Sequence, residues 1–310
     1  MIKEIHIARS YGFCMGVKRA ITIAEETART ATENVTILNE IVHNEAVVER
    51  FRREGVGQAF SVDEVQDGTL IISAHGVAPD VKAAAQERGL KVIDATCPLV
   101  EVIYDIVKKV VAEGYYVIHF GEPDHDETKG VVGHAPDRIT VIPPGTSLDD
   151  YPDWTDRKLA LTVQTTSHLE DSLAFQQAAL KKWPHLEVHD TICNATNKRQ
   201  SAIMELAPRM DMVLVVGSNT SANSKRLARI ADSLCGKGYL ISSDLDIKED
   251  WFDDTVEKVG ISAGASTPEF LVEAVIRKLQ RLSGGQATII KQPKAPRRKR
   301  AAMTAATPQQ

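Results

Sequence analysis

Short apolar runs alternate with amphipathic segments along most of the chain. Runs such as residues 35–42, 69–74 and 212–217 are rich in Val, Ile and Leu and have the length of buried strands. Segments such as 98–111 and 265–280 carry apolar residues every three to four positions, which predicts amphipathic helices. Buried strands that alternate with helices are typical of parallel sheets covered on both faces. The pattern therefore predicts an α/β protein.

The same order of elements occurs three times, and each repeat begins at a cysteine. Cys14, Cys97 and Cys193 each follow a strand-like run and precede a helix-like segment. They are 83 and 96 residues apart, a spacing that suits one small α/β unit per repeat. We therefore predict three pseudo-threefold-related α/β units with parallel sheets around a central cavity, to which each unit brings one cysteine. The predicted domains are residues 14–96, 97–192 and 193–282.

The two ends of the chain lie outside these repeats. The third unit lacks the closing strand of the other two, and we expect residues 1–13, with a strand at 2–8, to supply it; the run 287–292 is the alternative. Residues 283–310 hold six basic residues and no acids, which together with many Ala, Pro, Gln and Thr predicts a disordered basic tail. A solvated extension is the preferred interpretation of this tail, and nucleic acid is not an expected partner.

The composition fits a globular protein of the cell interior. Hydrophobic residues make up 43% of the chain and charged residues 25%, which are ordinary values for a soluble protein. The sequence shows no apolar stretch typical of a signal peptide or a membrane span. Four cysteines without a secretory signal favour a reducing compartment. We expect a cytoplasmic protein that does not contact membranes.

Polar residues follow the predicted strands of all three units. Because ligands of parallel α/β sheets bind beyond the carboxyl ends of the strands, these residues should face one central cavity. Imidazole, hydroxyl and carboxamide groups that precede helices suit a phosphate or diphosphate, although P-loop and dinucleotide fingerprints are absent. Helix capping is the alternative explanation for the serine and asparagine residues. The candidate anion-binding residues are His43, His75, His125, Ser221, Asn223 and Ser266.

The three repeated cysteines indicate a metal cofactor. Zinc sites usually show close cysteine pairs, which this sequence lacks. Three isolated cysteines can instead hold an iron–sulfur cluster whose fourth iron stays open to bind substrate as a Lewis acid while the cluster supplies electrons. Three buried structural thiols are the alternative. Cys235, inside a helix-like segment, is expected in the core.

Glu127 is the carboxylate best placed for proton transfer. It lies two residues after His125, in a loop that should face the proposed centre. A partly buried carboxyl has a raised pKa and can donate a proton. Thr165, within the sequence VQTTS, can hydrogen-bond a substrate hydroxyl. The alternatives are helix-dipole stabilisation for Glu127 and helix capping for Thr165.

Nine motifs occur in a fixed order: GFCMGVKRAI, VHNEAVV, SAHGVAP, DATCPLV, DHDETKG, QTTS, ICNATNKRQ, GSNTSANSKRL and SAGASTP. Together they resemble the 4-hydroxy-3-methylbut-2-enyl diphosphate reductase family of the non-mevalonate isoprenoid pathway, over residues 1–282. The resemblance implies a three-domain α/β trefoil with a 4Fe–4S cluster held by Cys14, Cys97 and Cys193. It also implies reductive dehydroxylation of the named diphosphate to isopentenyl diphosphate and dimethylallyl diphosphate.

The resemblance assigns roles to the other candidates. The catalytic group is Glu127, Thr165 and His125, in which Glu127 belongs to the proton-delivery route and Thr165 orients Glu127 or the substrate hydroxyl. Electrons come from a reduced ferredoxin or flavodoxin, because the chain has no flavin or nicotinamide fingerprint. The residues that contact the substrate are His43, His75, His125, Thr165, Ser221, Asn223 and Ser266.

The chain departs from the family pattern at two positions. Asp126 stands where the family often has proline, between His125 and Glu127. Ala222 stands where the family commonly has a second serine, so one hydrogen bond to the diphosphate is lost, worth about 0.5–1.5 kcal/mol. We expect a change of affinity and not of reaction.

Three other functions fit parts of the pattern. The first is a Lewis-acid enzyme of the quinolinate synthase type, whose cluster is also held by three scattered cysteines but transfers no net electrons. Such an enzyme would need no reductant, which distinguishes it from the reductase. The second is an iron–sulfur or zinc module that touches nucleic acid through the tail motif RRKR. The third is a phosphate-binding enzyme without a cofactor.

Overall fold

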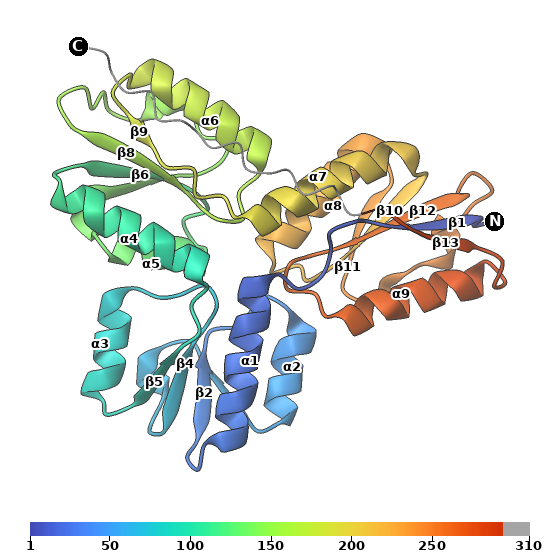
Figure 1. Ribbon diagram of the computed structural model, residues 1–310, viewed down its shortest axis with the longest axis horizontal. Helices are drawn as coiled ribbons and strands as arrows, with labels where there is room; N and C mark the ends of the chain where they lie inside the picture. Colours follow the sequence, from blue (N-terminus) through green and yellow to red (C-terminus); the bar gives the residue numbers. More distant parts are fainter. Residues whose placement is uncertain (294–310) are drawn as a thin grey trace.

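Three parallel sheets, each with helices on both faces, surround a common centre (Figure 1). The computed structural model describes residues 1–293. Every strand pair in this range is parallel. The predicted α/β trefoil is therefore confirmed. Because parallel strands end at the same edge of a sheet, each sheet can direct the loops after its strands toward the centre.

The first two sheets have the same strand order. The first runs β3-β2-β4-β5, with bounds Gly57–Ala59, Val35–Leu38, Thr69–Ile72 and Lys91–Asp94. The second runs β7-β6-β8-β9, with bounds Ile139–Ile142, Tyr116–Phe120, Leu159–Val163 and Glu187–Val188. In both, the strand that leads to the next cysteine lies at one edge.

The third sheet takes strands from both ends of the chain. Its order is β11-β10-β12-β1-β13, with bounds Gly238–Ile241, Met212–Val216, Lys258–Ala263, Glu4–Ile7 and Thr288–Lys291. β1 occupies the position that β5 and β9 have in the other sheets, and β13 adds a further edge strand beside it. The division into domains at residues 14, 97 and 193 stays a prediction.

The predicted start of the disordered tail is wrong. Residues 288–291 form β13, in which Ile289 lies opposite Ile5 of β1. The sequence offered residues 287–292 only as an alternative strand, because four residues that are mostly exposed give no alternating pattern. The basic motif RRKR lies at residues 297–300, outside the described residues.

The helices that begin at the cysteines cross from one sheet to the next. α1 (Met15–Thr30) follows β1 of the third sheet and packs on the first. α4 (Pro98–Ala112) follows β5 and packs on the second sheet, and α7 (Asn194–Leu206) follows β9 and packs on the third. The other helices are α2 (Glu45–Arg53), α3 (Pro79–Glu87), α5 (Asp126–Gly133), α6 (Leu169–Lys182), α8 (Ala222–Cys235) and α9 (Glu269–Leu282). None of the helices in residues 1–293 is both long and apolar enough to span a membrane.

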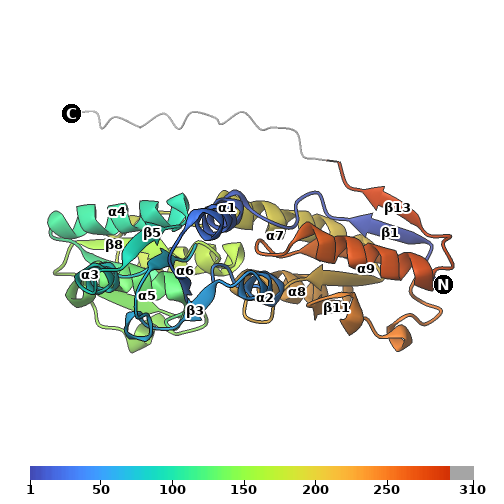
Figure 2. The same cartoon turned by 90° about the horizontal axis from the view of Figure 1, so that it is seen from below.

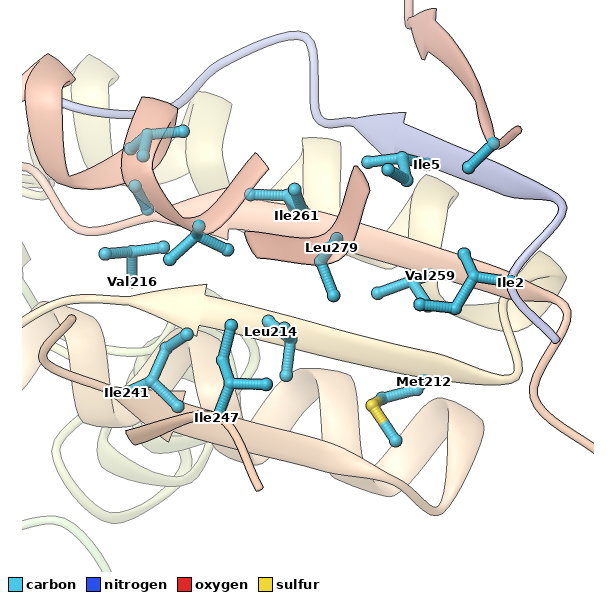
Figure 3. Close-up of a cluster of buried hydrophobic side chains, with 14 of the residues drawn as sticks. Ile2, Ile5, Met212, Leu214, Val216, Ile241, Ile247, Val259, Ile261 and Leu279 are labelled. Carbon is cyan, nitrogen blue, oxygen red and sulfur yellow. The ribbon is translucent and has the colours of Figure 1, made fainter. Parts of the chain in front are cut away.

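Apolar side chains pack between the third sheet and α9 (Figure 3), and a second cluster covers the other face of the sheet. Ile5 of β1 is fully buried in one cluster with Leu214, Ile261 and Leu279. Val213, the neighbour of Leu214 on β10, points to the opposite cluster beneath α7 and α8. Full burial of one such side chain contributes roughly 1.5–3 kcal/mol. This packing anchors the N-terminal strand and therefore the loop that leads to Cys14.

Candidate functional site

Each of the three cysteines caps a helix and makes an equivalent backbone hydrogen bond. The N–H of the cysteine donates to the carbonyl group that follows the third strand of a sheet, β12, β4 or β8. Since the same bond recurs in all three units, the cysteines occupy equivalent positions at the crossovers. The bonds are Cys14 to Ala265 at 3.0 Å, Cys97 to Ala74 at 2.9 Å and Cys193 to Thr165 at 3.1 Å.

The sulfur atoms lie where helix N-termini stabilise negative charge. The backbone N–H of Val17 donates to Cys14 Sγ at 3.4 Å, and that of Thr196 donates to Cys193 Sγ at 3.2 Å. Burial nevertheless raises the pKa of Cys97 and of Cys193. These thiols therefore favour the protonated form until a positively charged group binds them.

Arg199 supplies the buried positive charge beside these sulfurs, and sequence reasoning missed it. Its side chain is 4% exposed and makes no ion pair within residues 1–293. It donates to the carbonyl groups of Ala195 and Gly12, while its Nε has no hydrogen-bond partner in the described part of the chain. Burial lowers the pKa of Arg199, and the nearby Cys14 and Cys193 oppose this effect. The motif NKRQ in the first turns of α7 was the available signal.

The cysteine geometry suits a polynuclear metal group. A single tetrahedral ion would hold its sulfur ligands roughly 3.8 Å apart. Within residues 1–293, the three sulfurs do not all lie within 4.8 Å of one another. A side chain at Gly16 would place its Cβ only 2.4 Å from Cys97 Sγ, so glycine keeps the space beside this sulfur open. Wider sulfur spacing, soft ligands and the adjacent Arg199 fit an anionic iron–sulfur cluster.

Three histidines from two units meet in one cluster. The rings of His43 and His75 stack with their centroids 3.9 Å apart, and His125 lies edge-on at 5.4 Å and 5.8 Å from them. The backbone N–H of Glu127 donates to Nδ1 of His125 at 3.2 Å, so Nε2 of the neutral ring carries the proton. Glu40, another residue that sequence reasoning missed, contacts His43 Nδ1 at 2.9 Å.

The histidine cluster has properties that suit the binding of an anion. Burial, and then the nearby His43, lowers the pKa of His125 to about 3, and the pKa of His75 is lowered well below its ordinary value for the same reasons. Both rings are therefore neutral at pH 7, and a bound anion would stabilise their protonated forms. Asp126 Oδ2 lies 4.0 Å from His75 Nδ1, at the edge of the cluster. A cavity of about 460 Å³, lined by Gly76, Asp126 and Lys129 among others, adjoins it.

The third unit brings Ser221, Asn223 and Ser266 to the corresponding strand ends. Ser221 Oγ accepts the N–H of Ser224 at 3.3 Å and thus caps α8, as the alternative interpretation proposed. Ser266 Oγ donates to the carbonyl group of His43 at 2.8 Å, which joins this unit to the histidine cluster. Asn223 is 4% exposed, and neither polar atom of its amide has a partner in the described chain. The hydrogen-bonding capacity of these two buried atoms is therefore unused within residues 1–293.

Glu127 and Thr165 form a buried pair beside Cys193. The N–H of Thr165 donates to Glu127 Oε1 at 2.6 Å, and the hydroxyl group of Thr165 lies 2.6 Å from Oε2. Burial raises the pKa of Glu127 to about 7, although the hydrogen bonds from Thr165 lower it. The carbonyl group of Thr165 also accepts the N–H of Cys193. Thr165 therefore links the buried carboxyl group of Glu127 to the backbone of Cys193.

Tyr104 is a further residue beside the site that the sequence analysis did not identify. Its hydroxyl group donates to the carbonyl group of His75 at 3.3 Å, and its ring stacks on His134 at 4.0 Å. A Cβ at Gly76 or at Gly130 would lie within about 2.3 Å of its hydroxyl oxygen. Tyr104 thus holds the His75 loop against α5. It occurs among the apolar residues of α4, so only its contacts reveal this role.

Comparisons with known proteins identify relatives over most of the chain. A family model described as LytB protein matches residues 5–280. A protein of Bacillus velezensis named 4-hydroxy-3-methylbut-2-enyl diphosphate reductase is 38% identical over 278 residues, which cover 87% of this chain and 88% of that protein. One with the same name from Aromatoleum aromaticum is 38% identical, with 90% of both chains covered.

Structural comparison gives the same result. The structure of the E-1-hydroxy-2-methyl-but-2-enyl-4-diphosphate reductase from Plasmodium falciparum superimposes with a TM-score of 0.88 and 29% identity, and the match covers 96% of both chains. A second solved reductase, described as the terminal enzyme of the non-mevalonate pathway, is 35% identical over 91% of this chain, with a TM-score of 0.66. This chain therefore belongs to the LytB protein family.

Proposed function

We propose that this chain is the reductase that converts 4-hydroxy-3-methylbut-2-enyl diphosphate to isopentenyl diphosphate and dimethylallyl diphosphate. In this reaction the allylic C–O bond breaks, two electrons and two protons are taken up, one water leaves and one C–H bond forms. The observation that carries the proposal is the buried Glu127–Thr165 pair beside one of three equivalent cysteines. Membership of the family and the names of the relatives support it.

Cys14, Cys97 and Cys193 would hold a 4Fe–4S cluster. When bound, the cluster supplies electrons and an open iron for the substrate hydroxyl group. The protein's own contribution is to supply three thiolates at helix N-termini and the buried positive charge of Arg199. The helix N-termini and Arg199 balance part of the negative charge that a thiolate-bound cluster brings into a buried site.

The histidine cluster and the third-unit loops bind and orient the diphosphate. His125 presents Nε2–H, and the amide of Asn223 has a donor without a hydrogen-bond partner among residues 1–293. His43, His75, Ser221 and Ser266 complete this group. Neutral imidazoles that take up a proton as the anion arrives gain charge-assisted hydrogen bonds, which are about twice as strong as neutral ones. The diphosphate thereby fixes the position of the carbon–oxygen bond that will break.

Glu127 delivers a proton through Thr165. With a pKa of about 7, Glu127 keeps its proton in much of the protein at neutral pH. In that form the carboxyl group donates from Oε2 to the hydroxyl oxygen of Thr165, and the Thr165 O–H is free to donate to the leaving hydroxyl group. The N–H of Thr165 holds the other carboxyl oxygen, so the direction of proton movement is fixed. A reduced ferredoxin or flavodoxin in the cytoplasm supplies the electrons.

The test is anaerobic purification followed by turnover of 4-hydroxy-3-methylbut-2-enyl diphosphate with reduced methyl viologen. Wild type should be brown, contain about four irons per chain and yield both five-carbon diphosphates. Cys193→Ser should lose iron and activity, whereas Cys235→Ser, at the end of α8, should retain both. Turnover that needs no reductant would favour the Lewis-acid alternative. A protein that stays colourless after reconstitution with iron and sulfide would refute the proposal.

A further inference from the structure

Large apolar side chains are exposed immediately beside two of the cysteines. Met15, the residue after Cys14, is 78% exposed. Leu99, two residues after Cys97, is 41% exposed, and Val102 in the next turn is 49% exposed. Isolated exposed apolar residues are common on protein surfaces, but a group of them indicates a binding surface.

These residues belong to one surface because the first turns of α1 and α4 touch. Arg19 of α1 donates from Nη1 to the carbonyl group of Thr96 at 2.9 Å. A Cβ at Gly16 would collide with Cys97 Sγ, which places the backbone of α1 directly against this cysteine. The cysteines themselves are only partly buried. The exposed group therefore lies at the ends of α1 and α4 that carry Cys14 and Cys97.

The surface faces away from the anion-binding residues. α1, α4 and α7, which begin at the cysteines, lie toward one face of the flat molecule, and α2, α5 and α8 lie toward the other (Figure 2). His43, His125 and Ser221 lie at or next to the N-termini of the second group of helices. A protein that approaches over α1 and α4 can thus reach the cysteines while the diphosphate residues remain occupied.

The charges around this surface are mainly positive. Lys18 and Arg19 on α1 and Lys198 on α7 are exposed, and none of the three makes an ion pair within residues 1–293. Glu101, in the first turn of α4, is the neighbouring acid. The whole chain has a net charge of −5, so this local excess of cations differs from the rest of the molecule. Unpaired surface cations attract acidic partners and accelerate their association.

We propose that the surface formed by Met15, Lys18, Arg19, Leu99, Val102 and Lys198 docks a small acidic one-electron carrier protein, and that this is where the chain is reduced. The inference rests on the proposed function. In each encounter the carrier loses one electron and the cysteine-bound cluster gains it, and two encounters supply one turnover. An apolar centre with a charged rim is typical of transient interfaces, and electron-transfer complexes bury less than about 1,200 Å².

The experiment compares reduction by a protein electron donor, flavodoxin, with reduction by a small-molecule donor, methyl viologen. Met15→Glu and Lys18→Glu should each lower kcat/KM for reduced flavodoxin by about tenfold, which corresponds to about 1.4 kcal/mol. Turnover with reduced methyl viologen should stay within about twofold, because the dye needs no docking surface. The loss should diminish at high salt, where screening weakens the attraction in the wild type. Leu245→Glu, at a residue 87% exposed on η5 (Asp244–Asp246), and Lys248→Glu are the matched controls and should change neither rate.

Stopped-flow reduction of the cluster by flavodoxin, without substrate, separates this inference from the proposed function. A slower reduction of Met15→Glu and Lys18→Glu than of the controls supports docking even if the diphosphate proves not to be the substrate. Equal losses with dye and flavodoxin would overturn the docking surface, because the variants would then act on the site itself. Unchanged reduction by flavodoxin in both variants would also overturn it.

Discussion

Burial determines what Glu127 can do. The side chain is 2% exposed, its hydrogen bonds come from Thr165, and no cation of residues 1–293 forms an ion pair with it. The neutral form is therefore favoured, and the pKa rises to about 7. Asp126, the next residue toward the N-terminus, is only partly buried and faces His75 instead. Neighbouring acids in one motif thus have different chemistry because their side chains point to different surroundings.

Glu127→Gln should lower turnover by about 10²–10⁴-fold, which is the usual contribution of a general acid. The amide has the same shape and can keep the contacts to Thr165, so the iron content and the affinity for the diphosphate should remain unchanged. The measurement is anaerobic turnover with reduced methyl viologen, together with iron analysis. Asp124→Asn, three residues away on the exposed part of the same loop, is the control. Full activity of Glu127→Gln would disprove the proton-delivery role.

The raised pKa of Glu127 also predicts how stability depends on pH. Between pH 4.5 and about 7 the folded carboxyl group keeps a proton that the unfolded chain has lost. Its contribution to stability is therefore complete below pH 4.5 and is lost as the pH rises through about 7. Glu127→Gln removes this loss, so above pH 7 the variant should become more stable relative to the wild type, by up to about 3 kcal/mol. Anaerobic denaturant unfolding of both proteins across this range measures the difference, and a difference that does not vary with pH would contradict the assignment.

At the scale of elements, the crossovers explain why the cysteines meet. α1, α4 and α7 each leave one sheet and pack on the next, so their first residues must lie at the junction of two units. The hydrogen bond from each cysteine N–H to the loop after the neighbouring strand then fixes where the helix begins relative to that strand. A cysteine in a helix that returns to its own sheet, such as Cys235 at the end of α8, lies at the edge of the core instead.

Gly16→Ala tests the space between α1 and Cys97. Alanine favours a helix over glycine by about 1 kcal/mol, so the variant should fold at least as readily as the wild type. The new Cβ would lie 2.4 Å from Cys97 Sγ, which forces the sulfur to move. We expect a folded protein with a reduced iron content and reduced turnover. Iron analysis and circular dichroism check both parts, with Thr22→Ala on the exposed side of α1 as the control.

At the scale of the whole molecule, the N-terminal strand closes the third sheet. β1 lies between β12 and β13, and its Ile5 is fully buried. The loop from β1 leads directly to Cys14, so packing of this strand positions the first cysteine. β13 contributes less to the core, because three of its four residues are exposed. The trefoil therefore depends on the beginning of the chain more than on its end.

Truncation of the C-terminus distinguishes the proposed reductase from a module that binds nucleic acid through RRKR. Removal of residues 294–310 should leave turnover with reduced viologen and the iron content within about twofold of the wild type, since no proposed site residue lies there. Removal of residues 287–310 also takes away β13 and exposes the edge of β1, so the melting temperature should fall by a few degrees. Loss of activity on removal of residues 294–310 alone would contradict the proposed site.

The sequence by itself determined the α/β class, the threefold repeat and most of the site candidates. Strand and helix periodicities are local, and a cysteine between a strand and a helix is visible without a structure. The sequence also indicated a raised pKa for Glu127, and burial of this carboxyl group raises its pKa to about 7. The ligand and substrate roles of these residues stay predictions.

Only the tertiary structure decided which side chains from different units share a contact. Ser266 reaches the His43 carbonyl group across 223 residues of sequence, and Arg199 reaches Gly12 across 187. Such contacts depend on where the crossover helices place each unit, which no local pattern encodes. β13 also depends on long-range packing, because it forms a strand by pairing with the free edge of β1. Local periodicity specifies elements, whereas burial and long-range packing specify the charge state and the partners of the residues between them.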